Sequence, residues 1–434
     1  MNGRPPGVAE HDTVARLPRQ LADHPLAEGL IKADYEDFRV EELPLYEASG
    51  EGTHTYVLIE KRGLSTMQAV SDLARALNVR RRDIGYAGLK DARAVTRQWL
   101  SIEHMPPERV TDVQVPRLTV LHVTRHRNKL RLGHLLGNRF QIRVRHTDVS
   151  RLAEFQDGLA ALARIGVPNY FGRQRFGGRG DVWQVGRAIV GGRLDEALDI
   201  LLGHPLPSDR ANVRRARELY ENGDYSAAAL AWPHLFRDER RALKALAQTR
   251  GNKKRGFLAI DPHLRRFYVS AYQSYLFNAV VARRMPAGLG RLQSGDLAWL
   301  HASGAVFKVS DAMAEQPRAD AFEISPTGPL FGYRMTTPEG APGALEAELL
   351  REEGLDPSAL RSEHLRIKGQ RRPLRFQPRG ASLRLGADER GPYLEFCFEL
   401  PSGCYATSLL REFFVDADVD AGRHGSEDID DDEG

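Results

Sequence analysis

The chain has 434 residues, 41% hydrophobic and 28% charged, a composition typical of a globular protein with two or three domains. No stretch approaches the ~18 apolar residues that suggest a membrane-spanning helix, and residues 1–12 lack a basic-then-apolar secretion signal, so we expect a cytoplasmic protein. The formal net charge is +4, but nine acidic residues and one arginine in residues 416–434 leave +12 on residues 1–415. A basic body of this kind suggests a polyanion partner such as nucleic acid.

Several cofactor and metal motifs are missing from the sequence. Two cysteines, Cys397 and Cys404, are too few for a disulfide framework or a cysteine-rich zinc site. The chain has no HExxH and no GxxxxGK[ST], and its glycines at 177–180 do not fit GxGxxG. We therefore expect neither a metal nor a cofactor.

The first third of the chain predicts strands and one helix. Short strands are predicted at residues 38–40, 55–59 and 99–102. Ser65 or Thr66 can cap a helix whose apolar positions follow the helical spacing at Val70, Leu73, Ala74 and Leu77. Two glycines within residues 85–88 indicate a turn or a close backbone approach.

Residues 139–145 give the clearest strand pattern. Phe140, Ile142 and Val144 alternate with Arg and Gln, so period two places the apolar set on the core and the arginines on the other face. These arginines belong to a stretch, residues 121–146, with seven basic residues and no acidic one.

The middle of the chain is predicted to be helical. Residues 182–202 indicate two short helices interrupted at Gly191–Gly192, residues 208–255 are helical and charged, and residues 264–285 form a strongly amphipathic helix. A strand is expected again at residues 393–400, followed by a turn at 401–403 and a short helix capped by Thr407 or Ser408. A helix-rich unit inserted between two strand-rich pieces explains this order.

The segment from Gly85 to Trp99, GYAGLKDARAVTRQW, places Lys90 and Asp91 on a glycine-rich turn in basic surroundings. An aspartate at such a place is more often a turn or helix-capping residue than a catalyst, and a lysine is usually solvated. The spacing alone therefore does not decide between a structural and a catalytic role.

Five segments, in order, resemble the TruD family of tRNA pseudouridine synthases. GLKDARAVTRQW at residues 88–99 resembles the family's catalytic motif. The other matches are KADYEDFRV at 32–40, KLRLG and GNRF at 129–133 and 137–140, VPNYFGRQRFG at 167–177, and LPSGCYATSLLRE at 400–412. Together they span roughly residues 30–415.

The resemblance implies isomerisation of uridine in tRNA, at position 13 in the bacterial family, by one aspartate without a cofactor. By motif this aspartate is Asp91. A carboxylate can attack C1′ of the ribose or remove the C2′ proton to give a glycal, and both mechanisms remain open. The target base must leave its stack and enter a pocket.

The resemblance also implies supporting residues. Lys32 matches the basic partner of the aspartate, and Phe38, Asn138 and Tyr405 match the base pocket. The family commonly has Phe where this chain has Tyr405; a tyrosine keeps the stacking ring. For Phe140 we favour simple core packing. The basic clusters predict contacts with the RNA backbone from the following residues: Lys90, Arg125, Arg127, Lys129, Arg371 and Arg372.

The expected fold is α+β: a pseudouridine-synthase-like catalytic domain, with a central mixed or antiparallel sheet and flanking helices, interrupted by a helix-rich inserted TruD-type domain. We predict a disordered N-terminus at 1–20, a catalytic domain from 21–167 plus 372–418, an insert at 168–371 and a disordered acidic tail at 419–434. Alternative functions are a synthase acting on other structured RNA and a non-catalytic RNA-binding protein. Neither a membrane nor a metal is an expected partner.

Overall fold

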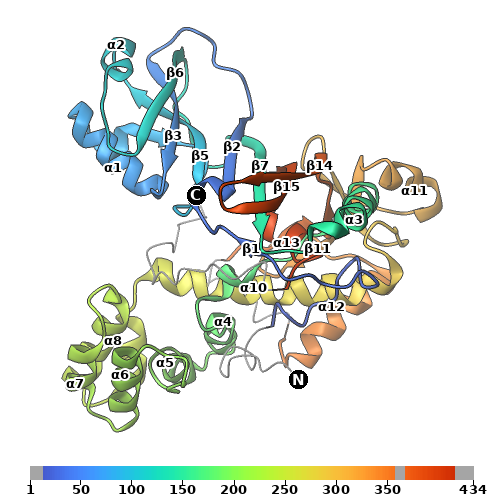
Figure 1. Cartoon of the computed structure of the whole chain (residues 1–434). Helices are drawn as coiled ribbons and strands as arrows, with labels where there is room; N and C mark the ends of the chain where they lie inside the picture. Colours follow the sequence, from blue (N-terminus) through green and yellow to red (C-terminus); the bar gives the residue numbers. More distant parts are fainter. Residues whose placement is uncertain (1–12, 357–366, 416–434) are drawn as a thin grey trace. The chain divides into compact units, whose positions relative to one another are not determined.

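The computed structural model describes residues 13–356 and 367–415, so the predicted acidic tail and the first part of the predicted N-terminal segment lie outside the described residues. The chain divides into two compact units. Among the described residues, the sheet unit combines residues 19–167 with 376–415, and the helical unit consists mainly of residues 168–356 and 367–375. Figure 1 labels the elements of both units. No helix among the described residues is long and apolar enough to cross a membrane.

The sheet unit contains one nine-stranded mixed sheet. Its main order is β14-β15-β7-β2-β5-β3-β6, with β1 also pairing with β7 and β4 with β5. The β2–β5 pair is parallel and the other strand pairs are antiparallel. The strands are β1 (Leu30–Ile31), β2 (Phe38–Pro44), β3 (His54–Arg62), β4 (Ile84–Tyr86), β5 (Val95–Glu103), β6 (Leu118–His126), β7 (Leu135–Arg145), β14 (Arg379–Asp388) and β15 (Gly391–Pro401). A mixed central sheet confirms the predicted fold class.

Helices and short 3-10 turns flank this sheet. They are η1 (Tyr35–Asp37), α1 (Thr66–Leu77), η2 (Arg81–Asp83), α2 (Pro107–Thr111), η3 (Val149–Arg151), α3 (Leu152–Ile165) and α13 (Ala406–Leu410). Ser65 caps α1 by accepting a hydrogen bond from the amide of Gln68, as its sequence position predicts. The predicted apolar face, including Val70 and Leu73, is buried with residues of β3 and β5. A second core joins β2, β7 and β15 to α3 and α13.

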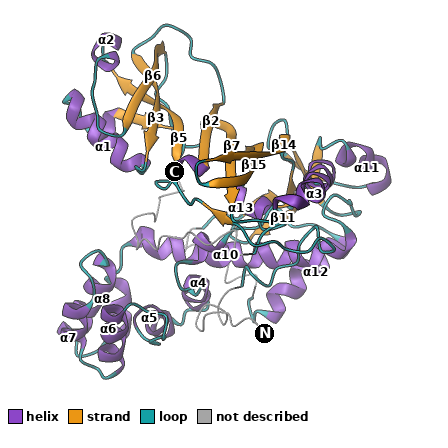
Figure 2. Cartoon of the chain, viewed as in Figure 1, coloured by secondary structure: helices purple, strands orange, loops and turns teal. Residues whose placement is uncertain are grey.

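The helical unit contains the predicted helices and a small sheet of its own (Figure 2). Its helices are η4 (Arg173–Phe176), α4 (Val182–Val190), α5 (Leu194–Leu202), α6 (Ala211–Glu221), α7 (Tyr225–Ala231), α8 (Arg237–Gln248), α9 (Lys253–Leu258), α10 (Pro262–Arg284), η5 (Met285–Ala287), α11 (Ala312–Asp320) and α12 (Gly340–Glu352). The interruption between α4 and α5 falls at Gly191–Gly192, as predicted. Its sheet has the antiparallel order β10-β9-β11-β12.

The strands of this smaller sheet were not expected from the sequence. They are β9 (Leu297–Leu300), β10 (Val306–Lys308), β11 (Ile324–Leu330) and β12 (Gln370–Pro373). β11 contains two prolines and a glycine, ISPTGPL, which weaken the sequence signal for a strand. Two further short strands, β8 (Val167–Pro168) and β13 (Arg375–Phe376), stand where the chain leaves and re-enters the sheet unit.

Strand β7 confirms the predicted alternation with one correction. Phe140, Ile142 and Val144 are buried in the core, while Arg139 lies on the other face and binds Glu399 at 2.7 Å. Arg145, expected on the exposed face, is instead 5% exposed. Its guanidinium binds the carboxylates of Asp37 and Asp388, each at 2.7 Å, and these hydrogen bonds, first that of Asp388, raise the pKa of Arg145.

Replacing Arg145 by methionine should strongly destabilise the sheet unit. Asp37 is fully buried, so the substitution leaves a carboxylate without its cation, which typically costs about 3–5 kcal/mol. Arg139→Met is the matched control on the same strand, because its ion pairs are solvent-exposed and worth about 0–1 kcal/mol. Urea unfolding measures both variants, and equal losses would contradict this account of the buried cluster.

Candidate active site

The predicted catalytic aspartate lies on the loop between β4 and β5. The carboxylate Oδ1 of Asp91 is 3.4 Å from the Nζ of Lys32, so the two motif residues meet although 59 positions separate them in the sequence. The Asp91 side chain is 37% exposed, whereas that of Lys32 is only 10% exposed. The carboxylate is therefore accessible from one side and held by an ammonium from the other.

Lys32 is positioned by its backbone and by an aromatic ring. Its φ of 59° lies in the left-handed region, which is unfavourable for a residue with a side chain. Its Nζ lies 4.4 Å from the ring centroid of Phe38, a cation–π contact. Phe38 is 2% exposed and packs edge-on against Phe140, so the predicted pocket residue also fixes Lys32.

Lys90 lies beneath the loop and does not point into solvent. Its Nζ is 2.8 Å from the Glu42 carboxylate, and both side chains are nearly inaccessible. The backbone amide of Lys90 donates to Thr66 Oγ1, and this hydroxyl donates to Gln98 Oε1. The prediction that Lys90 contacts the RNA backbone is therefore wrong. Its ammonium is paired with Glu42 inside the protein, and this ion pair anchors the loop directly before Asp91.

Lys61 provides a second anchor that the sequence analysis missed. Its fully buried Nζ donates to the carbonyl oxygens of Leu64, Lys90 and Asp91 at 2.5, 3.3 and 3.1 Å. A signal was present in the sequence: period two along β3 places residue 61 on the same face as Val57 and Ile59, which are buried. A lysine at an inward strand position indicates a specific partner.

Asn138 lies in β7 and is not a turn residue. It is paired with Glu42 on one side and Leu400 on the other. Its Oδ1 is buried and has no hydrogen-bond partner among the described residues. Because buried polar atoms are normally paired, this unpartnered oxygen is consistent with the predicted role of Asn138 in the base pocket, which stays a prediction. Asn138 is paired with Glu42 in the sheet, and the Glu42 carboxylate binds Lys90, the residue before Asp91. These two contacts connect Asn138 to the loop that carries Asp91.

Gly137 allows β15 to approach β7 closely beside Asn138. A Cβ on Gly137 would lie 2.1 Å from the carbonyl oxygen of Leu400, so any side chain would push the strands apart. The strand partner of Gly137 is Pro401. Four residues later, the half-buried Tyr405 forms the N-cap of α13. The helix thus begins before the predicted caps Thr407 and Ser408, which lie inside it. The strand register places Tyr405 at the Asn138 end of the sheet.

The remaining predicted residues are spread over two units. On the sheet unit, Arg125 donates to the carbonyl of Gly52, Arg127 pairs with Glu51, and Lys129 donates to the carbonyl of Arg82. These three remain at least partly exposed and stay predictions for RNA contact.

Arg371 and Arg372 belong to the helical unit. Arg371 is buried and binds Glu346 at 2.7 Å, so the prediction that it contacts RNA is corrected. Arg372 donates to Asn169 Oδ1 at 2.6 Å and stacks over Phe171. Its proposed contact with RNA stays a prediction.

The Lys61 anchor can be tested without an activity assay. Lys61→Met keeps an unbranched chain but removes the donors to three carbonyl groups, so residues 86–94 should exchange amide hydrogens faster. Hydrogen–deuterium exchange of this peptide provides the measurement. Arg62→Met, the next residue on β3, is the control because its ion pairs with Asp34 and Glu36 are surface contacts. Unchanged exchange in Lys61→Met would contradict the anchoring role.

The chain is similar to known proteins over most of its length. The family model described as tRNA pseudouridine synthase D (TruD) matches residues 19–413. A protein named tRNA pseudouridine synthase D from Geobacter metallireducens is 49% identical over 385 residues, covering 88% of this chain and 94% of the relative. Another of the same name from Geobacter sulfurreducens is 45% identical, covering 93% and 97%.

A solved structure shares the fold as well. A crystal structure assigned as tRNA pseudouridine synthase D (TruD) from Methanosarcina mazei has a TM-score of 0.81 and 29% identity, covering 94% of this chain and 98% of that chain. With a matching family model and near-complete coverage of relatives well above 30% identity, the chain belongs to the tRNA pseudouridine synthase D (TruD) family.

Proposed function

We propose that this chain isomerises uridine to pseudouridine in tRNA, with Asp91 as the catalytic residue and position 13 as the target. Family membership supports the reaction, and one observation supports the assignment of Asp91: its carboxylate is accessible and lies 3.4 Å from the buried Lys32 ammonium. Because tRNA is the substrate and no membrane is needed, we place this activity in the cytoplasm.

The reaction is a balanced rearrangement. The N1–C1′ bond breaks, the uracil rotates, C5 bonds to C1′, and the proton lost from C5 is matched by one gained at N1. No oxidant, reductant or group donor is consumed. The residues must therefore bind the base, hold it during rotation and stabilise a ribose that becomes electron-poor at C1′.

Asp91 fits either chemical route at the ribose. As a nucleophile its carboxylate attacks C1′; as a base it takes the C2′ proton and leaves a glycal. In both routes the carboxylate must be fixed relative to the sugar. Lys32 holds the carboxylate, while Lys61 and Lys90 hold the loop backbone. We assign these lysines to positioning.

Asn138 and Tyr405 are the proposed contacts to the uracil. The free Oδ1 of Asn138 can accept a hydrogen bond from the N3–H of the base, and its amide group can donate to a base carbonyl. The half-buried Tyr405 ring offers a face for stacking. We also assign Phe38, whose ring contacts the Lys32 ammonium, to the base pocket.

Asp91→Asn should abolish conversion while leaving tRNA binding nearly intact. The amide can neither attack C1′ nor accept the C2′ proton, so pseudouridine formation should fall by several orders of magnitude. Asp91→Glu should also be nearly inactive, because one methylene shifts the carboxylate by on the order of 1 Å. Single-turnover conversion of a tRNA transcript, measured beside filter binding, tests both, and substantial conversion by Asp91→Asn would rule out Asp91 as the catalyst.

Mapping the modified nucleotide in the same reaction tests the target. Pseudouridine at position 13 supports the full proposal, and a different tRNA position rejects only that detail. Modification confined to another structured RNA would favour the first alternative. RNA binding by wild-type protein without any conversion would favour a non-catalytic binding protein.

Tyr405→Phe should be mild and Tyr405→Ala severe. The phenylalanine keeps the stacking ring, whereas alanine removes an interaction worth about 1–3 kcal/mol per base. Steady-state KM and kcat for a tRNA transcript separate the two variants. Equal damage in both would assign the effect to the hydroxyl group and contradict the stacking role.

A further inference from the structure

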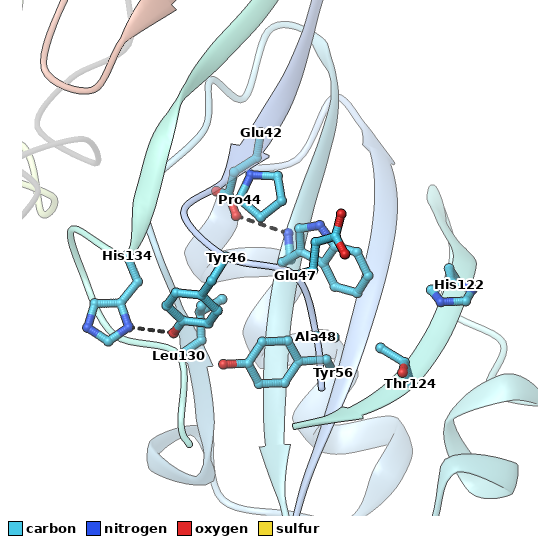
Figure 3. Close-up of a pocket in the computed structure, with 11 residues that line it drawn as sticks. Glu42, Pro44, Tyr46, Glu47, Ala48, Tyr56, His122, Thr124, Leu130 and His134 are labelled. Carbon is cyan, nitrogen blue, oxygen red and sulfur yellow. Dashed lines mark hydrogen bonds between the residues drawn. The ribbon is translucent and has the colours of Figure 1, made fainter. Parts of the chain in front are cut away.

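The sheet unit contains a cavity of about 240 Å³ that none of the proposed catalytic contacts uses, apart from the buried Glu42. Its walls come from the end of β2 and the segment after it, from β3, β5 and β6, and from the loop before β7. Figure 3 shows the cavity with the rings of Tyr46 and Tyr56 side by side and His134 next to Tyr46. The lining includes the rings of Tyr46, Tyr56, Trp99 and His134 and the carboxylates of Glu42 and Glu47. We call this cavity the aromatic pocket.

The aromatic pocket borders the start of the Asp91 loop, because Tyr56 and Leu130 of its lining pack with Ala87, but it does not reach Asp91 itself. Strand parity places Tyr56 and Trp99 on the sheet face opposite Lys61 and Gln98, whose contacts hold that loop. Asp91 and Lys32 are absent from the lining. A base held at Asp91 therefore does not fill this pocket.

The rings in and beside the pocket are preorganised. Tyr46 stacks on His126 at 5.1 Å with an interplanar angle of 16°, and its hydroxyl is hydrogen-bonded to His134 Nδ1 at 2.8 Å. The Tyr56 hydroxyl donates to the carbonyl of Asn128 at 3.0 Å, and Trp99 lies near Tyr56. Rings fixed in this way can receive another planar ring at little entropic cost.

The size and polarity of the pocket suit a nucleobase. At about 240 Å³ it is smaller than the roughly 300–1,000 Å³ typical of drug-sized ligands. Its walls combine π faces with hydrogen-bonding groups, including the carboxylate of Glu42 and the ring of His134. The described residues contain no group of three His, Cys, Asp or Glu that could hold a metal, so the nearby histidines do not indicate a metal site.

A basic segment that suits a phosphate backbone continues from β6, the strand that contributes His122 and Thr124 to the lining. β6 and the turn after it carry Arg125, Arg127, Lys129 and Arg131, and no acidic residue occurs between positions 121 and 146. Arg127 is largely exposed despite its contact with Glu51. This basic segment and the aromatic lining match the two parts of an unstacked nucleotide, and the lining itself carries the carboxylates of Glu42 and Glu47.

We propose that the aromatic pocket binds an unstacked base of the tRNA other than the uracil that is isomerised. This inference rests on the proposed function. Glu42 links the pocket to the proposed catalytic loop, because its carboxylate lines the pocket and also binds Lys90, the residue before Asp91. Both bases then belong to one RNA strand held on two faces of the same sheet.

Tyr46 gives the sharpest test. Tyr46→Ala removes the stacking ring and should raise KM for a tRNA transcript about 5- to 100-fold, with kcat within about twofold. Tyr46→Phe keeps the ring and should stay within about twofold of wild type. Leu45→Ala, at a neighbouring exposed position outside the lining, is the control and should also be unchanged. Thermal unfolding of each variant confirms that the fold is retained.

Ultraviolet crosslinking locates the base directly. Irradiated wild-type protein with tRNA should give a crosslink to Tyr46, Tyr56 or Trp99, on a nucleotide different from the one converted. An unchanged KM in Tyr46→Ala, an equal rise in Tyr46→Phe, no crosslink to these three rings, or a crosslink to the converted uridine would each overturn the proposal. Conversion by the wild-type protein is measured first, so failure of the proposed function is seen separately from failure of the pocket.

Discussion

A buried ion pair between Glu42 and Lys90 is the constraint on which the site depends. Removing two charges from water is costly, and the cost is offset only when geometry and further hydrogen bonds are favourable. Here Lys90 meets the carboxylate at 2.8 Å, its amide is bound by Thr66, and Glu42 also accepts from the amide of Trp99. An arrangement with this many requirements has few alternatives, so the loop that carries Asp91 has one position on the sheet.

Lys61 extends the same principle to the loop backbone. A glycine-rich turn has many conformations in isolation, and its carbonyl groups would otherwise be solvated. The buried Lys61 ammonium donates hydrogen bonds to the carbonyl oxygens of Lys90 and Asp91. These hydrogen bonds form only when the turn is formed. The carboxylate of Asp91 can therefore stay accessible while its backbone is fixed from below.

Local patterns predicted much of the fold and less of its electrostatics. The strands around residues 140 and 396 and the cap at Ser65 depend on short-range periodicity, and the structure has them. The distribution of charged residues along the sequence, in contrast, predicted that Arg145, Lys90 and Arg371 lie on the surface. Their partners Asp37, Glu42 and Glu346 lie 108, 48 and 25 positions away, so no local pattern reveals that these cations are buried.

The site residues came from a different kind of signal. The spacing around Asp91 did not separate a turn residue from a catalyst, and only the resemblance of five ordered segments favoured the catalytic assignment. It also paired Lys32 with Asp91, and the two are in contact in the structure. It did not indicate Lys61 or the aromatic pocket, because these depend on which strand faces meet.

The order of the strands has a consequence for synthesis of the chain. β7 ends at Arg145, but β15, which covers one of its edges, begins only at Gly391. At about 5–20 residues per second, the ribosome needs roughly 12–50 s to make the intervening chain. During this interval the nascent strand has an open edge that could pair with another nascent copy. Arg139 and Arg143, whose partners Glu399 and Glu395 arrive only with β15, leave positive charge along that edge and so discourage premature association.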